Sequence, residues 1–176
     1  MALLERCRRL RNHGRTGGGE PFVDPAPGFN FRLSELHAAL GVAQMTRLEE
    51  LIAARARLAA GYSERLSGAA GLELPAPAEP GERIAWSTYV VRVPPGPGLR
   101  DRVAARLTAD GIGNGHYFPA IHQLPPYAKD PASRRGPLPV TAAAADRCLA
   151  LPFFPGLSEA SMDRVCERLR AAISAG

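Results

Sequence analysis

Residues 28–51, GFNFRLSELHAALGVAQMTRLEEL, contain the change from an irregular segment to a long helical pattern. Ser34 is a typical N-cap residue, and apolar side chains follow it at intervals of three and four. The pattern continues to Leu66, so we predict one long helix over residues 34–66 with a bend near Gly41. A helix of this length typically joins one domain to another or carries an oligomer interface.

The segment before this helix has two parts. Residues 1–12 have apolar side chains at helical spacing and predict a short basic helix that ends at His13 and Gly14. Residues 15–28, RTGGGEPFVDPAPG, are rich in glycine and proline and predict a connecting loop. The triple glycine lacks a preceding strand and the Gly-Lys-Ser/Thr signature, so we do not interpret it as a phosphate-binding loop.

The segment after the long helix alternates between strands and helices, and this order indicates the α/β fold class. Ser158 caps the last helix, with Leu157 and Met162 at hydrophobic-staple positions. We predict a strand over residues 86–93, a helix over 99–109, a strand over 112–118, a loop over 123–139, a short helix over 140–148, a strand-like segment over 149–152 and the last helix.

Length and composition describe one ordinary globular domain. The chain has 176 residues, of which 45% are hydrophobic and 22% charged, and this composition excludes intrinsic disorder. No stretch approaches the ~18 apolar residues of a membrane span, and the first residues do not form a secretory signal. Three cysteines without metal-ligand spacing predict reduced thiols and a cytoplasmic location.

The basic charge does not indicate a nucleic-acid partner. The net charge is +5 and the pI about 9.6, but the basic residues are spread along the whole chain. They cluster tightly only at Arg6, Arg8, Arg9 and Arg11, where no aromatic residues are interleaved.

Three residues near the end of the second predicted strand are candidates for contact with a substrate. His116 and Tyr117 lie at the end of this strand, and His122 lies in the loop that follows. Strand ends in α/β domains commonly carry substrate-contacting groups. From the residues alone, however, the two histidines are more simply interpreted as ordinary loop residues that bind the backbone. Their spacing does not resemble a metal-binding pair on one helix face, and we predict no metal site.

A second candidate site lies just before the long helix. Asn30 offers a side-chain amide and Arg32 a guanidinium, which together suit a phosphate or carboxylate near a helix N-terminus. Asn30 could instead serve only to turn the chain into the helix, and the residues alone leave both interpretations open.

Covalent catalysis finds no support in the sequence, and we assign no catalytic residue. There is no Gly-x-Ser-x-Gly motif, and no cysteine has a histidine close in sequence. Schiff-base chemistry needs a lysine in a tuned pocket. The only lysine, Lys129, lies in a polar, proline-rich loop.

Four segments in order carry a resemblance to a known family. They are RNHG (11–14), residues 28–51, GIGNGHYFPAIHQLPPY (111–127) and LALPFFPGLSEASMDRV (149–165). Together they resemble the C-terminal half of the DegT/DnrJ/StrS family of pyridoxal-phosphate-dependent aminotransferases, which act mostly on nucleotide-linked keto-sugars. The resemblance implies the aspartate-aminotransferase type of fold. Residues 1–40 would then be the tail end of the large domain, residues 41–66 the linking helix and residues 67–176 the small C-terminal α/β domain.

The resemblance also implies roles for the candidate residues. Asn30 would reach across a homodimer to the cofactor phosphate of the neighbouring subunit, and Arg32 would lie near the substrate or its phosphates. His116, Tyr117 and His122 match the loop that approaches the sugar nucleotide. The resemblance thus favours a substrate-binding role for these three residues over an ordinary loop role.

The family's Schiff-base lysine, pyridine-pairing aspartate and ring-stacking aromatic residue all precede the RNHG segment. We therefore expect that the chain does not transaminate by itself. Three hypotheses follow: a portion of a sugar aminotransferase, a non-catalytic partner that completes the dimer site of a full-length homologue, or a binding module for a nucleotide sugar or nucleic acid. The first two predict an exposed apolar surface that includes Phe29, Phe31, Leu33 and Leu36.

Overall fold

A computed structural model describes residues 2–14, 28–129 and 138–175 of the chain. The chain divides into two compact units, Met1–Leu48 and Glu49–Gly176. The predicted connecting loop lies outside the described residues except for Gly28, and this includes the triple glycine.

The first unit contains helix α1 (Ala2–Leu10) and helix α2 (Glu35–Met45), and neither helix has a buried residue. Apolar residues lie on nearly every side of α2, a pattern typical of a helix enclosed by other elements. Phe29, Phe31 and Leu33 are exposed, as is Leu36 of α2, which confirms the predicted exposed apolar surface. No helix of the described residues is both long and apolar enough to cross a membrane.

The prediction of one helix over residues 34–66, bent near Gly41, is wrong. Helix α2 ends at Met45 and helix α3 (Leu48–Leu66) begins after Thr46 and Arg47, whereas Gly41 lies inside α2. The Thr46 hydroxyl donates to the Ala43 carbonyl at 2.8 Å. Such a side-chain bond competes with the helical ladder, and this explains a break at Thr46 rather than at the glycine.

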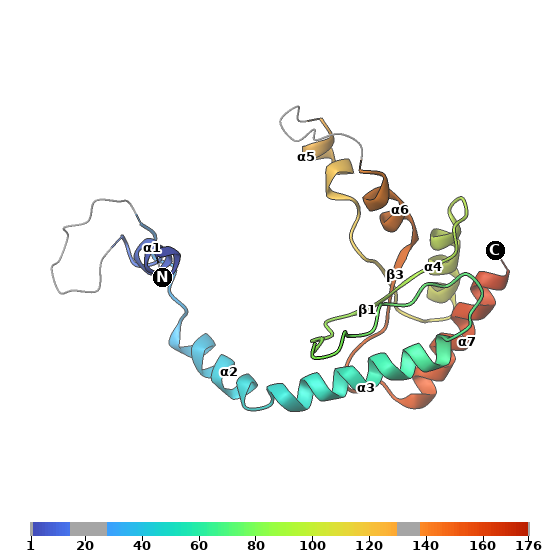
Figure 1. The fold of residues 1–176 in the computed structure, drawn as a ribbon, viewed down its shortest axis with the longest axis horizontal. Coiled ribbons are helices and arrows are strands. Elements are labelled where there is room, and N and C mark those ends of the chain that lie inside the picture. The colour runs from blue at the N-terminus through green and yellow to red at the C-terminus, as the bar shows by residue number, and fades with distance from the viewer. Residues whose placement is uncertain (1, 15–27, 130–137, 176) are drawn as a thin grey trace. The chain divides into compact units, whose positions relative to one another are not determined.

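The second unit contains a three-stranded antiparallel sheet and several helices (Figure 1). The strand order is β1-β3-β2, and Val91 of β1 pairs with Leu149 of β3. In chain order, α3 is followed by β1 (Tyr89–Arg92), α4 (Leu99–Ala109), β2 (Gly115–His116), the 3-10 helix η1 (Ile121–Gln123), α5 (Pro125–Ala128), α6 (Pro139–Arg147), β3 (Cys148–Leu151) and α7 (Glu159–Ser174).

The core of the second unit lies on one face of the sheet. Alternate residues of β1 and β3 are buried, as the two-residue period of a strand requires. These side chains join one apolar cluster with residues of α3, α4 and α7. Its largest fully buried members are Tyr62, Tyr89, Leu66, Leu107, Leu149, Met162, Leu169, Val91, Val93 and Val103.

Two predicted strands are shorter in the structure. The strand predicted over 86–93 is confined to Tyr89–Arg92, and the one predicted over 112–118 to Gly115–His116. The side chain of Asn114 donates to the carbonyls of Ala104 and Ile112, at 3.1 and 3.2 Å. These bonds hold the start of the second segment to α4, and pairing with β3 begins only after Asn114.

The loop predicted over residues 123–139 is also partly wrong. Helix α5 lies within it, the 3-10 helix η1 ends at its first residue, Gln123, and residues 130–137 lie outside the described residues. Pro125 stands at the first position of α5, where a proline loses no helical hydrogen bond. The short helix predicted after this loop is confirmed as α6, and the last helix as α7 with Ser158 as its N-cap.

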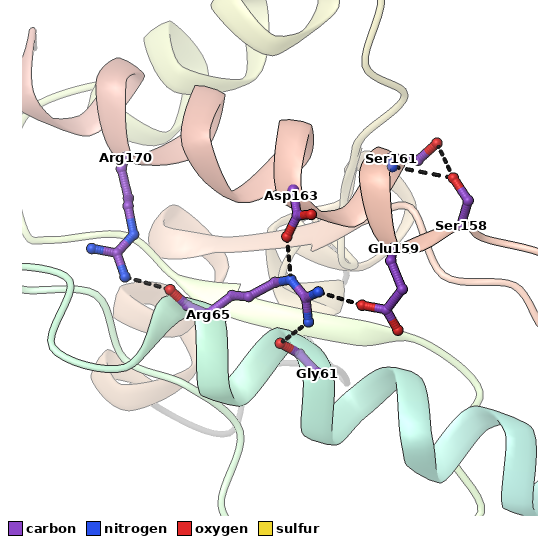
Figure 2. Close-up of polar contacts among 7 residues, drawn as sticks. All are labelled: Gly61, Arg65, Ser158, Glu159, Ser161, Asp163 and Arg170. Carbon is purple, nitrogen blue, oxygen red and sulfur yellow. Dashed lines mark hydrogen bonds and ion pairs between the residues drawn. The ribbon is translucent and has the colours of Figure 1, made fainter.

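Arg65 of α3 forms hydrogen bonds and ion pairs with α7 (Figure 2). Its guanidinium donates to Asp163 at 2.6 Å, to Glu159 and to the Gly61 carbonyl at 3.2 Å. The hydrogen bond to Asp163 raises the pKa of Arg65 above its ordinary value, so the charge persists at any physiological pH. Nearby, Arg170 of α7 donates to the carbonyl of Arg65 itself.

Replacing Arg65 with methionine should therefore weaken this helix pair. We expect the free energy of unfolding to fall by about 1 kcal/mol, the size of a partly exposed ion-pair network rather than of a buried one. Chemical denaturation followed by circular dichroism measures the change. Arg168→Met is the matched control, because Arg168 of α7 makes only a 4.0 Å ion pair with Asp110. Equal losses in both variants would contradict the role of the Arg65 cluster.

Candidate functional site

An apolar groove of about 650 Å³ lies in the second unit, between the segment after β2 and helix α6. Two phenols, an imidazole, a threonine hydroxyl and a thiol interrupt its otherwise apolar wall. This combination of a large apolar surface with a few polar groups is typical of small-molecule sites. The lining residues are Tyr117, Phe118, Pro119, Ala120, Ile121, His122, Tyr127, Leu138, Val140, Thr141, Ala144, Ala145 and Cys148.

Phe118, one of the lining residues, has an unusual backbone conformation. Phe118 has a φ of 53°, a left-handed conformation that bulky residues rarely adopt. Its N–H donates to the His116 carbonyl at 3.0 Å, and its ring packs on Tyr117 with centroids 4.7 Å apart. Strained residues of this kind cluster at ligand sites, so the conformation supports a binding role for the segment.

Two of the three candidate residues of this segment come together in the groove. Tyr117 and His122 both contribute to its wall. His116 does not line it: its Nε2 lies 3.4 Å from Oδ1 of Asp101 in α4, and both side chains are about half exposed. This contact places the His116 ring beside α4 rather than in the groove.

The α6 side of the groove contains none of the residues predicted from the sequence. Cys148, the first residue of β3, lines the groove together with three residues of α6: Thr141, and Ala144 and Ala145, which follow Thr141 by three and four positions. That spacing places them on one side of a helix, and a stripe of such small residues could have been noticed. It resembles an ordinary packing face, however, and only the folded chain shows that this face borders open space.

The second candidate site lies in the first unit, where two short segments pair through their backbones. The His13 N–H donates to the Phe29 carbonyl at 2.8 Å, and the Phe29 N–H donates to the Leu10 carbonyl at 2.6 Å. Asn12 and Asn30 form an antiparallel bridge between the same segments. The pairing therefore holds Asn30 at a defined place, although the intervening chain is long.

Gly28 makes this close approach possible. A Cβ atom at this position would stand 2.0 Å from the backbone nitrogen of Gly14, far inside van der Waals contact. Any other residue would push the two segments apart. Backbone packing thus explains why position 28 is a glycine. Asn30 and Arg32 follow it in the same segment.

Asn30 and Arg32 are both exposed. The Arg32 guanidinium donates to the side-chain oxygen of Asn12 and makes no other side-chain hydrogen bond within the described residues, so its remaining N–H groups can meet an anion. These donors have the chemistry of a phosphate or carboxylate site.

The cysteines and acidic residues offer no alternative centre in the described residues. Burial raises the pKa of the Cys166 thiol to about 11, so Cys166 is neutral and packs as a core residue. No group of three or more His, Cys, Asp or Glu side chains within residues 2–14, 28–129 and 138–175 could hold a metal ion.

The fold is that of a portion of an aminotransferase. The sequence profile of the DegT/DnrJ/EryC1/StrS aminotransferase family matches residues 1–170, and the chain belongs to this family. A GDP-perosamine synthase from Caulobacter vibrioides is 36% identical over 171 residues, which are 95% of this chain and 44% of that protein.

Solved structures give the same result. DesV from S. venezuelae, in complex with a ketimine intermediate, matches with a TM-score of 0.82 and 31% identity over 97% of this chain and 44% of that chain. The aminotransferase TlmJ from Streptoalloteichus hindustanus matches with a TM-score of 0.84 and 29% identity over 99% and 46%. These matches confirm the predicted family and fold class. The chain spans less than half the length of these relatives and corresponds to a C-terminal half of a longer aminotransferase.

Proposed function

We propose that this chain forms the C-terminal portion of a pyridoxal-phosphate-dependent aminotransferase that acts on a nucleotide-linked keto-sugar. The observation that carries the proposal is the groove on which Tyr117 and His122 converge, in a chain that matches a family of aminotransferases over residues 1–170. Similarity to a GDP-perosamine synthase supports a nucleotide sugar as the substrate class.

The groove would bind and orient the substrate. Its apolar wall suits the flat face of a base or the carbon side of a sugar ring, and the Tyr117 hydroxyl and His122 ring can donate to sugar or phosphate oxygens. His116, paired with Asp101, would act at the edge of this site rather than inside it.

Asn30 and Arg32 would bind phosphate groups. We propose that the Asn30 amide donates to the phosphate of a cofactor bound by the neighbouring subunit of a homodimer, and that Arg32 meets the substrate or its phosphates. Their exposed N–H donors fit the phosphate end of pyridoxal phosphate. The cofactor, when bound, supplies the electron sink of the reaction.

The described residues do not fit the aldehyde end of the cofactor, where a lysine is needed. Lys129 is the only lysine in the sequence, and it stands exposed at the end of α5. We therefore propose that the 176 residues alone do not transaminate. In the complete enzyme, residues 1–40 would belong to the large domain, 41–66 to the linking region and 67–176 to the small domain. Three free cysteines support a cytoplasmic location.

The test is a transfer assay with glutamate and a nucleotide-linked keto-sugar. The 176-residue chain is compared with a chimera in which the N-terminal half of the GDP-perosamine synthase precedes it. We expect no amino-sugar from the chain alone and turnover from the chimera. Loss of turnover in a chimera with His122→Ala and Tyr117→Phe would locate the substrate at the groove. Turnover by the chain alone, or a folded and cofactor-loaded chimera that accepts no nucleotide sugar, would refute the proposal.

A further inference from the structure

Asn12 contacts both residues of the candidate phosphate site. Its side-chain oxygen accepts a hydrogen bond from the Arg32 guanidinium, and its backbone bridges to Asn30. Asn12 itself is half-buried, whereas Arg32 is exposed. An exposed arginine ordinarily samples many rotamers, so a partner on a paired backbone segment restricts where its charge lies.

The backbone around Asn12 is held from both sides. The Asn12 N–H donates to the Arg9 carbonyl at 3.0 Å, and the next residue, His13, adopts a left-handed φ of 58° while it donates to Phe29. The Phe31 N–H donates to the Arg11 carbonyl at 2.9 Å on the other side of the bridge. Asn12 is therefore a fixed point from which the Arg32 side chain is oriented.

The amide is better suited to this task than a carboxylate. An asparagine oxygen accepts one guanidinium N–H and leaves the positive charge uncompensated, and the remaining N–H donors stay available. An aspartate at the same position would hold Arg32 as firmly but would neutralise the charge that attracts an anion. An asparagine at position 12 can therefore orient Arg32 without neutralising its charge.

We propose that Asn12 is a positioning residue, which orients the Arg32 guanidinium toward a phosphate group of the substrate or cofactor. The inference rests on the anion-binding role proposed for Arg32. It adds a residue that touches no ligand itself and that acts through Arg32 alone.

The first measurement concerns the guanidinium and needs neither cofactor nor substrate. In the 176-residue chain labelled with ¹⁵N-arginine, the Nε–Hε signal of Arg32 is assigned by its loss in Arg32→Lys. We expect this signal to show restricted motion in the wild type and in Asn12→Asp, and free motion in Asn12→Leu. Glu5→Leu is the matched control, because it removes an acceptor from Arg8 in the same unit. Backbone shifts of Phe31 report whether the pairing survives each substitution.

The second measurement is the affinity of the same variants for inorganic pyrophosphate. We expect Asn12→Leu to bind about tenfold more weakly, the lower end of the loss expected for one hydrogen bond to a charged group. Asn12→Asp should bind at least as weakly although Arg32 remains ordered, and Arg32→Gln sets the limit of the effect. A merely structural role of Asn12 would not separate ordering from affinity in the aspartate variant.

Two results would overturn the inference. One is an equally ordered Arg32 in the wild type and Asn12→Leu. The other is unchanged pyrophosphate affinity in both Asn12 variants while Arg32→Gln weakens binding. Unchanged affinity in Arg32→Gln would refute the proposed anion role of Arg32 itself. This variant therefore distinguishes a failure of the proposed function of Arg32 from a failure of the role inferred for Asn12.

Discussion

Replacing Tyr62 with alanine is expected to remove about 4 kcal/mol from the free energy of unfolding of the second unit, enough to unfold a marginally stable domain. Tyr62 of α3 is fully buried and stacks on Tyr89 of β1 with ring centroids 5.0 Å apart. Its hydroxyl donates to the Pro152 carbonyl at 2.8 Å. The substitution removes a large side chain that joins a helix, the sheet and the segment after β3.

Tyr62→Phe is the matched control for this prediction. It keeps the ring but leaves the Pro152 carbonyl without its donor, so we expect a loss of about 1 kcal/mol. Burial raises the pKa of the Tyr62 phenol, and the side chain therefore remains a neutral donor at physiological pH. Urea unfolding followed by circular dichroism measures both variants. A loss in Tyr62→Ala no larger than in Tyr62→Phe would contradict the packing role.

Filling the groove should abolish substrate binding without harming the fold. Ala144 of α6 lines the groove, and an indole in its place would occupy the space that we assign to the nucleotide sugar. We expect Ala144→Trp to raise the Kd of the substrate at least about 100-fold, or about 2.7 kcal/mol. The change is made in the chimera of the transfer assay, and binding is measured by calorimetry.

Ala143→Trp is the control, because Ala143 is the neighbouring residue of the same helix, is exposed and does not line the groove. We expect its Kd to stay within about twofold of the wild type, since an exposed substitution away from the site leaves the contacts intact. Similar affinities in the two tryptophan variants would show that the substrate binds elsewhere.

The helices with an amphipathic pattern and a capping residue were predictable from local sequence. Helix α7 begins after Ser158, as expected, because its cap and the buried face of Met162 and Leu169 both belong to the segment itself. The end of α2 was not predictable in this way. It depends on the Thr46 hydroxyl bonding to Ala43, a local competition that the apolar periodicity does not reveal.

The residues of the candidate sites also differ in whether local sequence could predict them. Tyr117 and His122 could be selected because their segment carries unusual polar residues after a strand. The separation of His116 from them could not, since it depends on Asp101 in a helix that precedes the strand. Asn12 was missed for a similar reason: its partner Arg32 lies 20 residues further along the chain.

By itself, the sequence determined the family, the main helices and the residue types available for phosphate and sugar binding, because these depend on local patterns and on motifs read in order. The tertiary structure alone decided which of those residues share a site. The groove exists because α6 and the segment after β2, which are not adjacent in the sequence, are brought together around β3. Contacts between distant segments depend on packing of the whole unit, and no local pattern encodes them.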